Sequence, residues 1–246
     1  MNTQRHNWKK AFGKKIITRF FEPSEIDEIF SVVKNIEQEQ NRRDYIWKYY
    51  EQDKETISRI EYFVNHNRHL NNLANNDRIL KEVNFLMGEE CVLFKDKINF
   101  KYPNGEEFKA HQDVSAGWGN YCNKHITFAI PLGDTTEENG CMYFGKKEDK
   151  QLTETFTDLS EDIELKPTYT KKGDVILFDS YIPHASHKNM SSEARTILFF
   201  TYTPMSEGSF YEKYHADKFK AVPPDIHKTK GKKYRSGNSN SEEREY

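Results

Sequence analysis

The first third of the chain has the hydrophobic spacing of amphipathic helices. Its apolar residues between positions 26 and 36 recur at the interval of one helix face: Ile26, Ile29, Phe30, Val33 and Ile36. Residues 77–87 repeat this spacing, and Gly88 directly after them is a typical helix stop. The pattern predicts two helices that each bury one face against a larger body.

From residue 91 onward the spacing changes to that of β-strands. Between residues 97 and 101, Lys97, Asn99 and Lys101 alternate with two apolar residues, so polar side chains occupy one face of the strand. Three further runs are almost continuously apolar, which is typical of buried strands: 125–132, 174–178 and 196–202. A mainly β fold is therefore expected, with the helices of the N-terminal third against one sheet.

Composition narrows the class of protein without defining its chemistry. The 246 residues carry a net charge of −2, which gives no general attraction to nucleic acid or to an anionic membrane. No run of 18 apolar residues occurs, and the N-terminus lacks the apolar core of a secretion signal. Three cysteines without a CxxC motif indicate free thiols in a reducing cytoplasm. We expect one cytoplasmic domain over residues 1–227, with a flexible tail over 228–246.

The first candidate for chemistry is the pair His111 and Asp113. Residues two apart on a strand point to the same face, so this pair could provide two ligands of a 2-His-1-carboxylate iron site. By itself the pair is a weak signal, because His-x-Asp also occurs as a hydrogen-bonded surface pair. A third ligand is needed from another strand.

A second stretch offers that ligand and a buried cation. The strand-like run 174–178 is followed by Pro183, which fixes the backbone just before His184. Arg195 opens the apolar run 196–202, where an unpaired charge is costly. A dicarboxylate cosubstrate would pair with it, since guanidinium binds carboxylate through two parallel hydrogen bonds.

Taken together, five elements resemble the phytanoyl-CoA dioxygenase superfamily of Fe(II)/2-oxoglutarate oxygenases. The resemblance extends over about residues 92–202 and depends on their order and spacing: His111-x-Asp113, Asn139-Gly140-Cys141, Lys172-Gly173-Asp174-Val175, Pro183-His184-x-Ser186 and Arg195. The chain departs from the family after Cys141, where it has residues 142–147 in place of a Pro-Gly-Ser-His-like loop. The resemblance implies a double-stranded β-helix (jelly roll, cupin-like) with its core at about residues 91–204.

The resemblance also implies roles for particular residues. Iron would bind His111, Asp113 and His184, with His187 as a rival to His184. 2-Oxoglutarate would bind Arg195 and Ser186, and Thr127 (or His125) and Lys97 would reach its carboxylates. Oxygen would then convert the cosubstrate to succinate and CO2 while the substrate is hydroxylated.

Two further stretches resemble the branch that contains 2-aminoethylphosphonate hydroxylases. They are residues 95–113 and the segment 216–226. This points to a small zwitterion as substrate, with Lys97, Asn99, Arg59 and Asn123 as donors for a phosphonate. Trp118 or Tyr121 would contact the amine. Three of these assignments have a simpler interpretation: an ion pair of Arg59 with Glu61 or Glu55, a solvated strand face that carries Lys97 and Asn99, and a packing role for Trp118.

Other classes remain open at this stage. A hydroxylase of free or carrier-bound amino acids needs the same contacts, a non-catalytic jelly-roll binding protein would keep only the fold, and a zinc hydrolase would give Arg195 no role. The protein is expected to act on a small molecule as a monomer or homodimer, without nucleic acid or membrane partners. The polar, aromatic segment 37–57 is interpreted as a helper surface or lid. Four histidines in polar contexts are expected to be exposed: His66, His69, His215 and His227.

Overall fold

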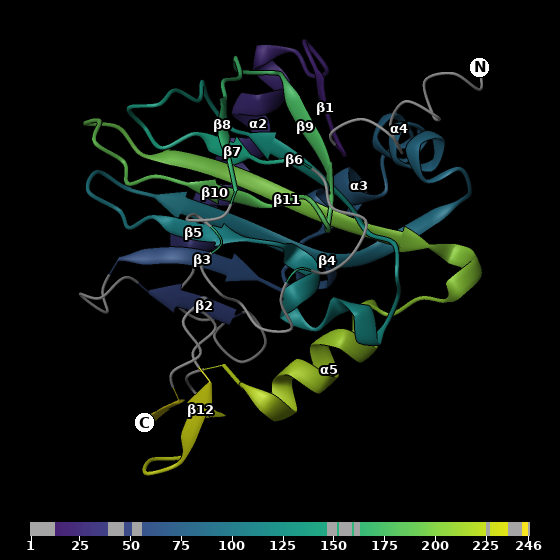
Figure 1. Ribbon diagram of the computed structural model, residues 1–246, viewed down its shortest axis with the longest axis vertical. Helices are drawn as coiled ribbons and strands as arrows, with labels where there is room; N and C mark the ends of the chain where they lie inside the picture. Colours follow the sequence, from purple (N-terminus) through teal and green to yellow (C-terminus); the bar gives the residue numbers. More distant parts are fainter. Residues whose placement is uncertain are drawn as a thin grey trace.

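Two antiparallel sheets form the body of the protein (Figure 1). The computed structural model describes residues 13–38, 47–50, 56–146, 152, 159, 163–224, 227–235 and 243–245. Among these, the large sheet has the strand order β1 (Lys14–Ile17), β9 (Val175–Asp179), β6 (Ile126–Pro131), β11 (Arg195–Pro204), β4 (Cys91–Lys101), β3 (Ile57–Glu61) and β2 (Trp47–Tyr50). The small sheet has the order β5 (Phe108–His111), β10 (His184–Ser186), β7 (Met142–Phe144) and β8 (Lys166–Thr168).

The path of the chain between these sheets identifies the jelly roll. From β4 to β11 the chain crosses repeatedly from the large sheet to the small one and back, with β7 and β8 as one consecutive pair in the small sheet. This winding confirms the predicted double-stranded β-helix. Among the residues that depart from the family motif, Met142–Phe144 form β7, which pairs with both β10 and β8.

Helices cover the outer face of the large sheet. They are α2 (Pro23–Gln38), α3 (Arg68–Ala74) and α4 (Asp77–Met87), and short 3-10 turns lie at η1 (Val64–His66), η2 (Asp113–Ala116), η3 (Trp118–Asn120) and η4 (Met205–Glu207). The predicted helix at 77–87 has the expected bounds, because Gly88 adopts the left-handed conformation (φ 88°) that ends it. Helix α3 was not predicted. Its last residue is held to the sheet by the Tyr202 hydroxyl, which donates to the Ala74 carbonyl at 2.7 Å.

Strand β4 separates the two interiors of the molecule. Its apolar residues Ile98 and Phe100 belong to the large core beneath the helices. The alternating residues Lys97, Asn99 and Lys101 point the other way, between the two sheets, as the predicted alternation requires. The polar face of β4 is therefore an inner wall of the jelly roll and not a solvated strand face.

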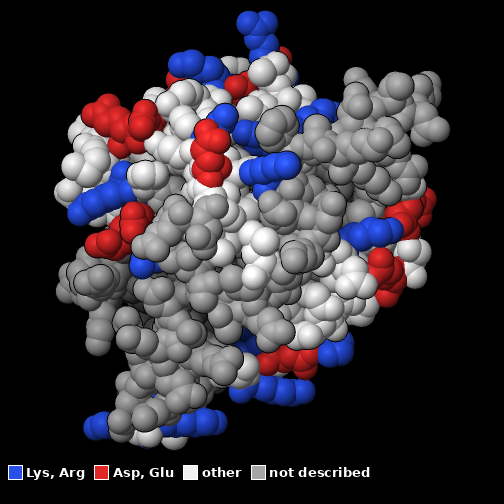
Figure 2. Space-filling view, viewed as in Figure 1, with Lys and Arg blue, Asp and Glu red and all other residues white. Residues whose placement is uncertain are grey.

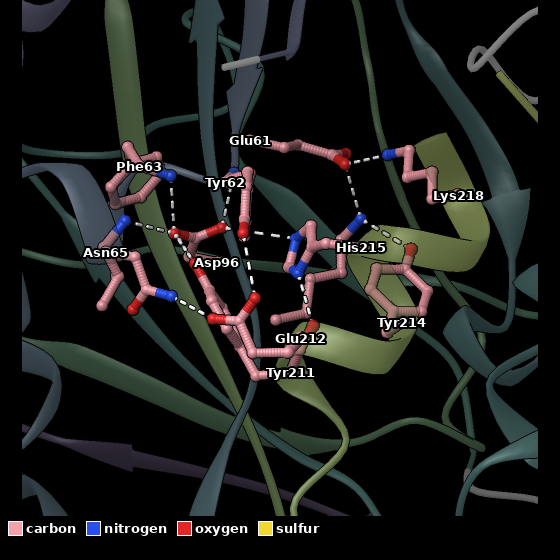
Figure 3. A network of polar contacts seen from close by, with 12 residues as sticks. Glu61, Tyr62, Phe63, Asn65, Asp96, Tyr211, Glu212, Tyr214, His215 and Lys218 are labelled. Carbon is pink, nitrogen blue, oxygen red and sulfur yellow. Dashed lines mark hydrogen bonds and ion pairs between the residues drawn. The ribbon is translucent and has the colours of Figure 1, made fainter. Parts of the chain in front are cut away.

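Helix α5 (Tyr211–Ala221) was not predicted as a helix, and a buried carboxylate fastens it to the sheet (Figure 3). Asp96 of β4 is fully buried and accepts hydrogen bonds from the backbone N–H groups of Tyr62 (2.6 Å), Phe63 (2.8 Å) and Val64 (2.7 Å). It also accepts one from the Tyr211 hydroxyl at 2.9 Å. One side chain thus joins β4, the turn after β3 and the first residue of α5.

His215 lies in the same network, so the prediction that it is exposed was wrong. Its side chain is 1% exposed, stacks on Tyr62 with ring centroids 4.2 Å apart, and hydrogen-bonds through Nδ1 to the Tyr211 carbonyl at 2.8 Å. Burial, reinforced by the nearby Lys95 charge, lowers the pKa of His215 to about 3. The polar sequence around it concealed one buried helix face.

This buried histidine predicts a loss of stability in acid. Its folded-state pKa is below the unfolded value near 6.5, so the unfolded state binds the extra proton; stability is full above pH 6.5 and is lost as the pH falls toward 3. At pH 5 the loss is about 2 kcal/mol. His215→Gln should reduce the fall in unfolding free energy between pH 7 and 5 by about that amount in urea titrations. His69→Gln, at an exposed position, is the matched control, and an unchanged pH slope in His215→Gln would contradict the assignment.

The remaining features of the fold bear less on function. No helix within the described residues is long and apolar enough to span a membrane. Basic and acidic side chains are interspersed on the face shown in Figure 2, in keeping with the small net charge. Most of segment 37–57 lies outside the described residues. In the expected tail, β12 (Lys233–Arg235) pairs with β13 (Glu243–Glu245), and the flexibility of residues 228–246 remains a prediction, as does the single-domain boundary.

Candidate metal centre

Three predicted residues converge between the sheets. His111 ends β5, Asp113 begins η2, and His184 begins β10, which lies antiparallel to β5 with His184 opposite His111. All three side chains are buried, and one ligand atom from each lies within 4.8 Å of the others. Among the described residues this is the only such group of histidine, cysteine and carboxylate side chains. His187, the rival to His184, is exposed and packs on Tyr143 with ring centroids 4.3 Å apart.

The two histidines are held in the form that binds metal. His111 Nδ1 lies 2.7 Å from the Lys109 carbonyl, and His184 Nδ1 lies 3.1 Å from the Ile182 carbonyl. A carbonyl only accepts, so each Nδ1 carries the proton and each Nε2 presents a lone pair to the centre. Burial and the neighbouring His184 lower the pKa of His111 to about 3, and burial lowers that of His184. Both rings are therefore neutral near pH 7.

Asp113 supplies the negative charge of the group. Burial alone would raise the pKa of its carboxyl, but the Lys97 ammonium and the two histidines together hold that pKa below the ordinary value. Its Oδ1 lies 3.8 Å from His111 Nε2, and its Oδ2, 3.9 Å from His184 Nε2, has no hydrogen-bond partner. A buried carboxylate oxygen without a partner beside two imidazole lone pairs fits a divalent cation such as Fe(II).

A second cluster fits a carboxylate-bearing cosubstrate. Arg195 at the start of β11 is 4% exposed; one Nη donates to the Gly140 carbonyl at 2.9 Å, and its Nε has no hydrogen-bond partner. Burial lowers the pKa of this guanidinium to about 10, and within the described part of the chain no carboxylate pairs with it. Gly140 has φ 73°, and a Cβ there would lie 2.5 Å from the His187 carbonyl oxygen, so only glycine fits this contact. The cluster therefore offers a buried cation that an anion would stabilise.

Two polar side chains of β4, Lys97 and Asn99, line the inner wall beside the triad. Lys97 of β4 is half-buried, its ammonium lies 4.6 Å from the centre of the Phe199 ring, and no side chain in the described segments hydrogen-bonds to it. Burial lowers the pKa of Lys97 to about 8, although the Asp113 charge acts in the opposite direction. Asn99, next on the same face, is 7% exposed, and its Oδ1 has no hydrogen-bond partner. These two side chains leave hydrogen-bonding capacity directed into the interior.

Glu61, which the sequence analysis named only as a possible ion-pair partner of Arg59, is the centre of a buried ion-pair network (Figure 3). This fully buried carboxylate on β3 binds Lys95 at 2.8 Å and Lys218 of α5, and it lies 3.4 Å from Arg59. The summed attraction of the cations, Lys218 foremost, outweighs burial and holds the pKa of Glu61 well below its ordinary range. Lys95 also donates to the Tyr214 hydroxyl at 3.1 Å. The network links α5 to the wall that carries Lys97 and Asn99.

Three other predicted residues make their contacts outside the triad. The Thr127 hydroxyl is paired with that of Thr201 at 2.9 Å. Trp118 is 2% exposed and packs on Phe94 with ring centroids 5.5 Å apart, although its buried Nε1 has no hydrogen-bond partner. Tyr121 donates to Asp217 of α5 at 3.1 Å.

Asn123 and His125, the last two predicted residues, differ in burial. Asn123 is exposed, outside the buried wall that carries Lys97. His125 is 1% exposed, and its Nε2 has no hydrogen-bond partner. Burial lowers the pKa of His125 to about 4, while the Asp113 charge acts against that change. The Asp113 charge therefore reaches His125, whereas Asn123 is exposed.

Comparison with known proteins identifies the family. Residues 11–197 match the phytanoyl-CoA dioxygenase (PhyH) family. The chain belongs to this family. It is 36% identical over 203 residues to a 2-aminoethylphosphonate dioxygenase from the uncultured bacterium HF130_AEPn_1, covering 78% of each chain. It is 32% identical over 171 residues to a methylphosphonate hydroxylase from Gimesia maris, covering 65% of this chain and 64% of that protein.

Solved structures support the same fold. EctD from S. alaskensis in its apoform superimposes with a TM-score of 0.69 at 19% identity, covering 84% of this chain and 78% of that one. The carbocyclase SnoK from nogalamycin biosynthesis has a TM-score of 0.68 at 15% identity, covering 83% of this chain and 84% of that one. These likenesses establish the jelly roll, and the family establishes the class of enzyme. The protein is an Fe(II)/2-oxoglutarate-dependent dioxygenase of a small-molecule substrate, which leaves the zinc-hydrolase and non-catalytic alternatives without support.

Proposed function

We propose that this enzyme hydroxylates a small phosphonate zwitterion, with 2-aminoethylphosphonate as the specific candidate, at the carbon that bears phosphorus. The observation that carries the proposal is the Lys97 ammonium, which faces the triad and has no hydrogen-bond partner in the described structure. A phosphonate needs concentrated donors, and a lysine ammonium next to a metal centre is a suitable one. The similarity to a 2-aminoethylphosphonate dioxygenase supports the same substrate class.

In this proposal each part of the interior has a separate task. His111, Asp113 and His184 hold iron, and Arg195 with Ser186 receives the distal carboxylate of 2-oxoglutarate. When bound, iron and 2-oxoglutarate supply the oxidation: O2 is consumed, the cosubstrate becomes succinate and CO2, and a substrate C–H becomes C–OH.

The inner wall of β4 handles the substrate. Lys97 neutralises the phosphonate. The Asn99 Oδ1, which has no hydrogen-bond partner, accepts a hydrogen bond from the ammonium group of the substrate or from a bound water. Arg59 is 14% exposed in its side chain, lies opposite Asn99 in the strand register and is 3.4 Å from Glu61, so it contributes a guanidinium to this wall. The protein's contribution is to hold the reacting carbon in a fixed place away from bulk water.

The test is coupled product formation. We expect anaerobically prepared Fe(II) enzyme, once given O2, to form succinate and hydroxylated product one for one with 2-aminoethylphosphonate. β-Alanine, its carboxylate counterpart, and ethylphosphonate, which lacks the amine, separate recognition of the two ends. Tight coupling to β-alanine or another amino acid, and to no phosphonate, would overturn the substrate assignment and favour the amino-acid hydroxylase alternative.

A variant of Lys97 tests whether the inner wall of β4 binds the phosphonate. Lys97→Met should raise the KM for the phosphonate about ten-fold or more, because a charge-assisted hydrogen bond is lost. Lys97 was also predicted to reach the cosubstrate, so the Kd of 2-oxoglutarate is measured in parallel. Lys124→Met, at an exposed position, is the matched control. If Lys97→Met changes only the Kd of 2-oxoglutarate and not the KM for the phosphonate, Lys97 binds the cosubstrate and not the substrate.

Location and assembly complete the proposal. We expect a cytoplasmic enzyme, because the three cysteines Cys91, Cys122 and Cys141 are free and buried and none forms a disulfide. We expect a monomer or homodimer acting without nucleic acid or membrane partners.

A further inference from the structure

Lys101 is a buried ammonium to which neither the motifs nor the comparisons give a role. It is 1% exposed and projects from the inner face of β4 toward the small sheet. Its Nζ donates to the Ser186 hydroxyl oxygen at 2.8 Å, to the Ser186 carbonyl at 3.3 Å and to the His187 carbonyl. The Phe108 ring lies beside it, with its centre 5.3 Å from Nζ. These contacts hold the Lys101 ammonium against β10, the strand that begins with His184.

These contacts determine what the Ser186 hydroxyl can do. An ammonium only donates, so the Ser186 oxygen must accept from Lys101. The single hydroxyl proton is then left to donate, and no acceptor for it lies among the described residues. Ser186 is 5% exposed, so this proton faces the interior and not bulk water. Lys101 therefore converts Ser186 from a group that could accept or donate into a directed donor.

Arg195 is related to this donor through Lys101 and Gly140. Arg195 and Lys101 are directly opposite each other on β11 and β4, and like charges in that arrangement repel. Gly140 connects the two: its carbonyl accepts from Arg195, and a Cβ on it would be 3.0 Å from the Lys101 Cδ. Arg195 keeps an unpartnered Nε. A carboxylate placed here would accept from both Arg195 and Ser186 and would offset the repulsion.

We propose that Lys101 is a positioning residue for the cosubstrate: it fixes Ser186 as a hydrogen-bond donor to the distal carboxylate of 2-oxoglutarate, beside Arg195. Lys101 itself does not contact the cosubstrate. The inference rests on the proposed function for the roles of Arg195 and Ser186, and it is independent of which substrate is hydroxylated.

The experiment measures binding and not turnover. The Kd of 2-oxoglutarate is determined by anaerobic titration of the Fe(II) enzyme, following the visible charge-transfer band. 2-Oxobutyrate is titrated in parallel, because it keeps the 2-oxo acid end and lacks the distal carboxylate. Lys101→Met should raise the Kd of 2-oxoglutarate about ten-fold and change the Kd of 2-oxobutyrate less than two-fold. Lys166→Met, at an exposed position on β8, should change neither.

A double-mutant cycle tests whether Lys101 acts through Ser186. Ser186→Ala should weaken 2-oxoglutarate about as much as Lys101→Met, with 2-oxobutyrate again unchanged. Because both remove the same donor, Lys101→Met/Ser186→Ala should be no weaker than either single variant. If the two effects multiply, or if Lys101→Met weakens both ligands equally, the positioning role is overturned.

The variants also separate this inference from the proposed function. Arg195→Lys keeps the charge but loses the paired N–H groups, so it should weaken 2-oxoglutarate and spare 2-oxobutyrate. If it does so while Ser186→Ala has no effect, the present inference and the Ser186 contact fail, but the role of Arg195 stands. If wild-type enzyme does not prefer 2-oxoglutarate to 2-oxobutyrate, the whole proposed cosubstrate site fails. Should Lys101→Met not fold, Ser186→Ala decides alone, because an unchanged Kd in that variant overturns the inference.

Discussion

Replacing Asp113 with alanine is expected to abolish iron binding and turnover while the protein stays folded. Asp113 is the only carboxylate of the triad, and its Oδ2 makes no hydrogen bond that the fold would lose. Removing it also removes the negative charge that two neutral imidazoles cannot replace. We expect Fe(II) affinity and succinate formation each to fall by more than about 100-fold, the upper range seen for residues that only support a metal ligand. Equilibrium Fe(II) titration measures the loss of iron binding, and thermal unfolding measures whether the protein stays folded.

Two controls make the metal prediction specific. His187→Ala removes the exposed histidine that was the rival ligand, so it should keep wild-type iron affinity. Asp134→Ala removes an exposed carboxylate that only accepts from Lys171 and Lys172, so it should leave activity unchanged. Wild-type turnover by the Asp113→Ala enzyme would exclude the triad as the iron site. Lost activity together with a lowered unfolding temperature would show instead that Asp113 supports the fold.

Local periodicity predicted the parts of this protein that local forces determine. The alternation at Lys97, Asn99 and Lys101 has the physical period of a strand, so it predicted that these side chains share one face, while a solvated face remained the alternative. The helix at 77–87 was predicted with its end because Gly88 carries the left-handed turn in one residue. His184 was preferred over His187 because its spacing to Arg195 matches the family and because Pro183 precedes it; in the structure His184 is buried and His187 is exposed.

Contacts between distant segments could not be predicted in the same way. Glu61 meets Lys95 across 34 positions and Lys218 across 157, and nothing in the residues next to Glu61 indicates either partner. Helix α5 has few apolar residues, and it buries Tyr211, Tyr214 and His215 only because Asp96 and Lys95 lie beneath it. Lys101 was recognised as part of a polar strand face, but its bond to Ser186 depends on how the two sheets pack.

The family match ends before the helix that completes the inner wall. Residues 11–197 contain the triad and Arg195, whereas α5 follows at 211–221. Lys218 of α5 reaches Glu61, which is opposite Lys97 in the strand register. The chemistry common to the family thus resides in the jelly roll, and the wall next to the proposed substrate is completed by a helix outside the matched region. This division predicts that changes in α5 alter substrate affinity more than iron affinity.

The attachment of α5 leads to the second large expected effect. Asp96→Ala should destabilise the protein by roughly 3–5 kcal/mol, because three backbone N–H groups and the Tyr211 hydroxyl lose their acceptor in a buried site. Asp96→Asn should cost less, about 2 kcal/mol. An amide oxygen in the place of Oδ2 keeps the contacts with Phe63, Val64 and Tyr211 and loses only the Tyr62 contact. Urea unfolding monitored by circular dichroism gives these differences.

The order of the variants by loss of unfolding free energy shows whether Asp96 acts as a buried hydrogen-bond acceptor or only as a charge. Tyr211→Phe removes one of the four donors and leaves the carboxylate solvated by the other three, so its cost should be about 1 kcal/mol. Asp134→Ala, which removes an exposed carboxylate, should cost less than about 1 kcal/mol. If Asp96→Ala costs no more than Asp134→Ala, Asp96 does not fasten α5. If the predicted order holds, Asp96→Asn at a temperature where it is folded should raise the KM for the phosphonate and leave the Fe(II) Kd unchanged, because the helix that carries Lys218 is loosened while the triad on the small-sheet side is not.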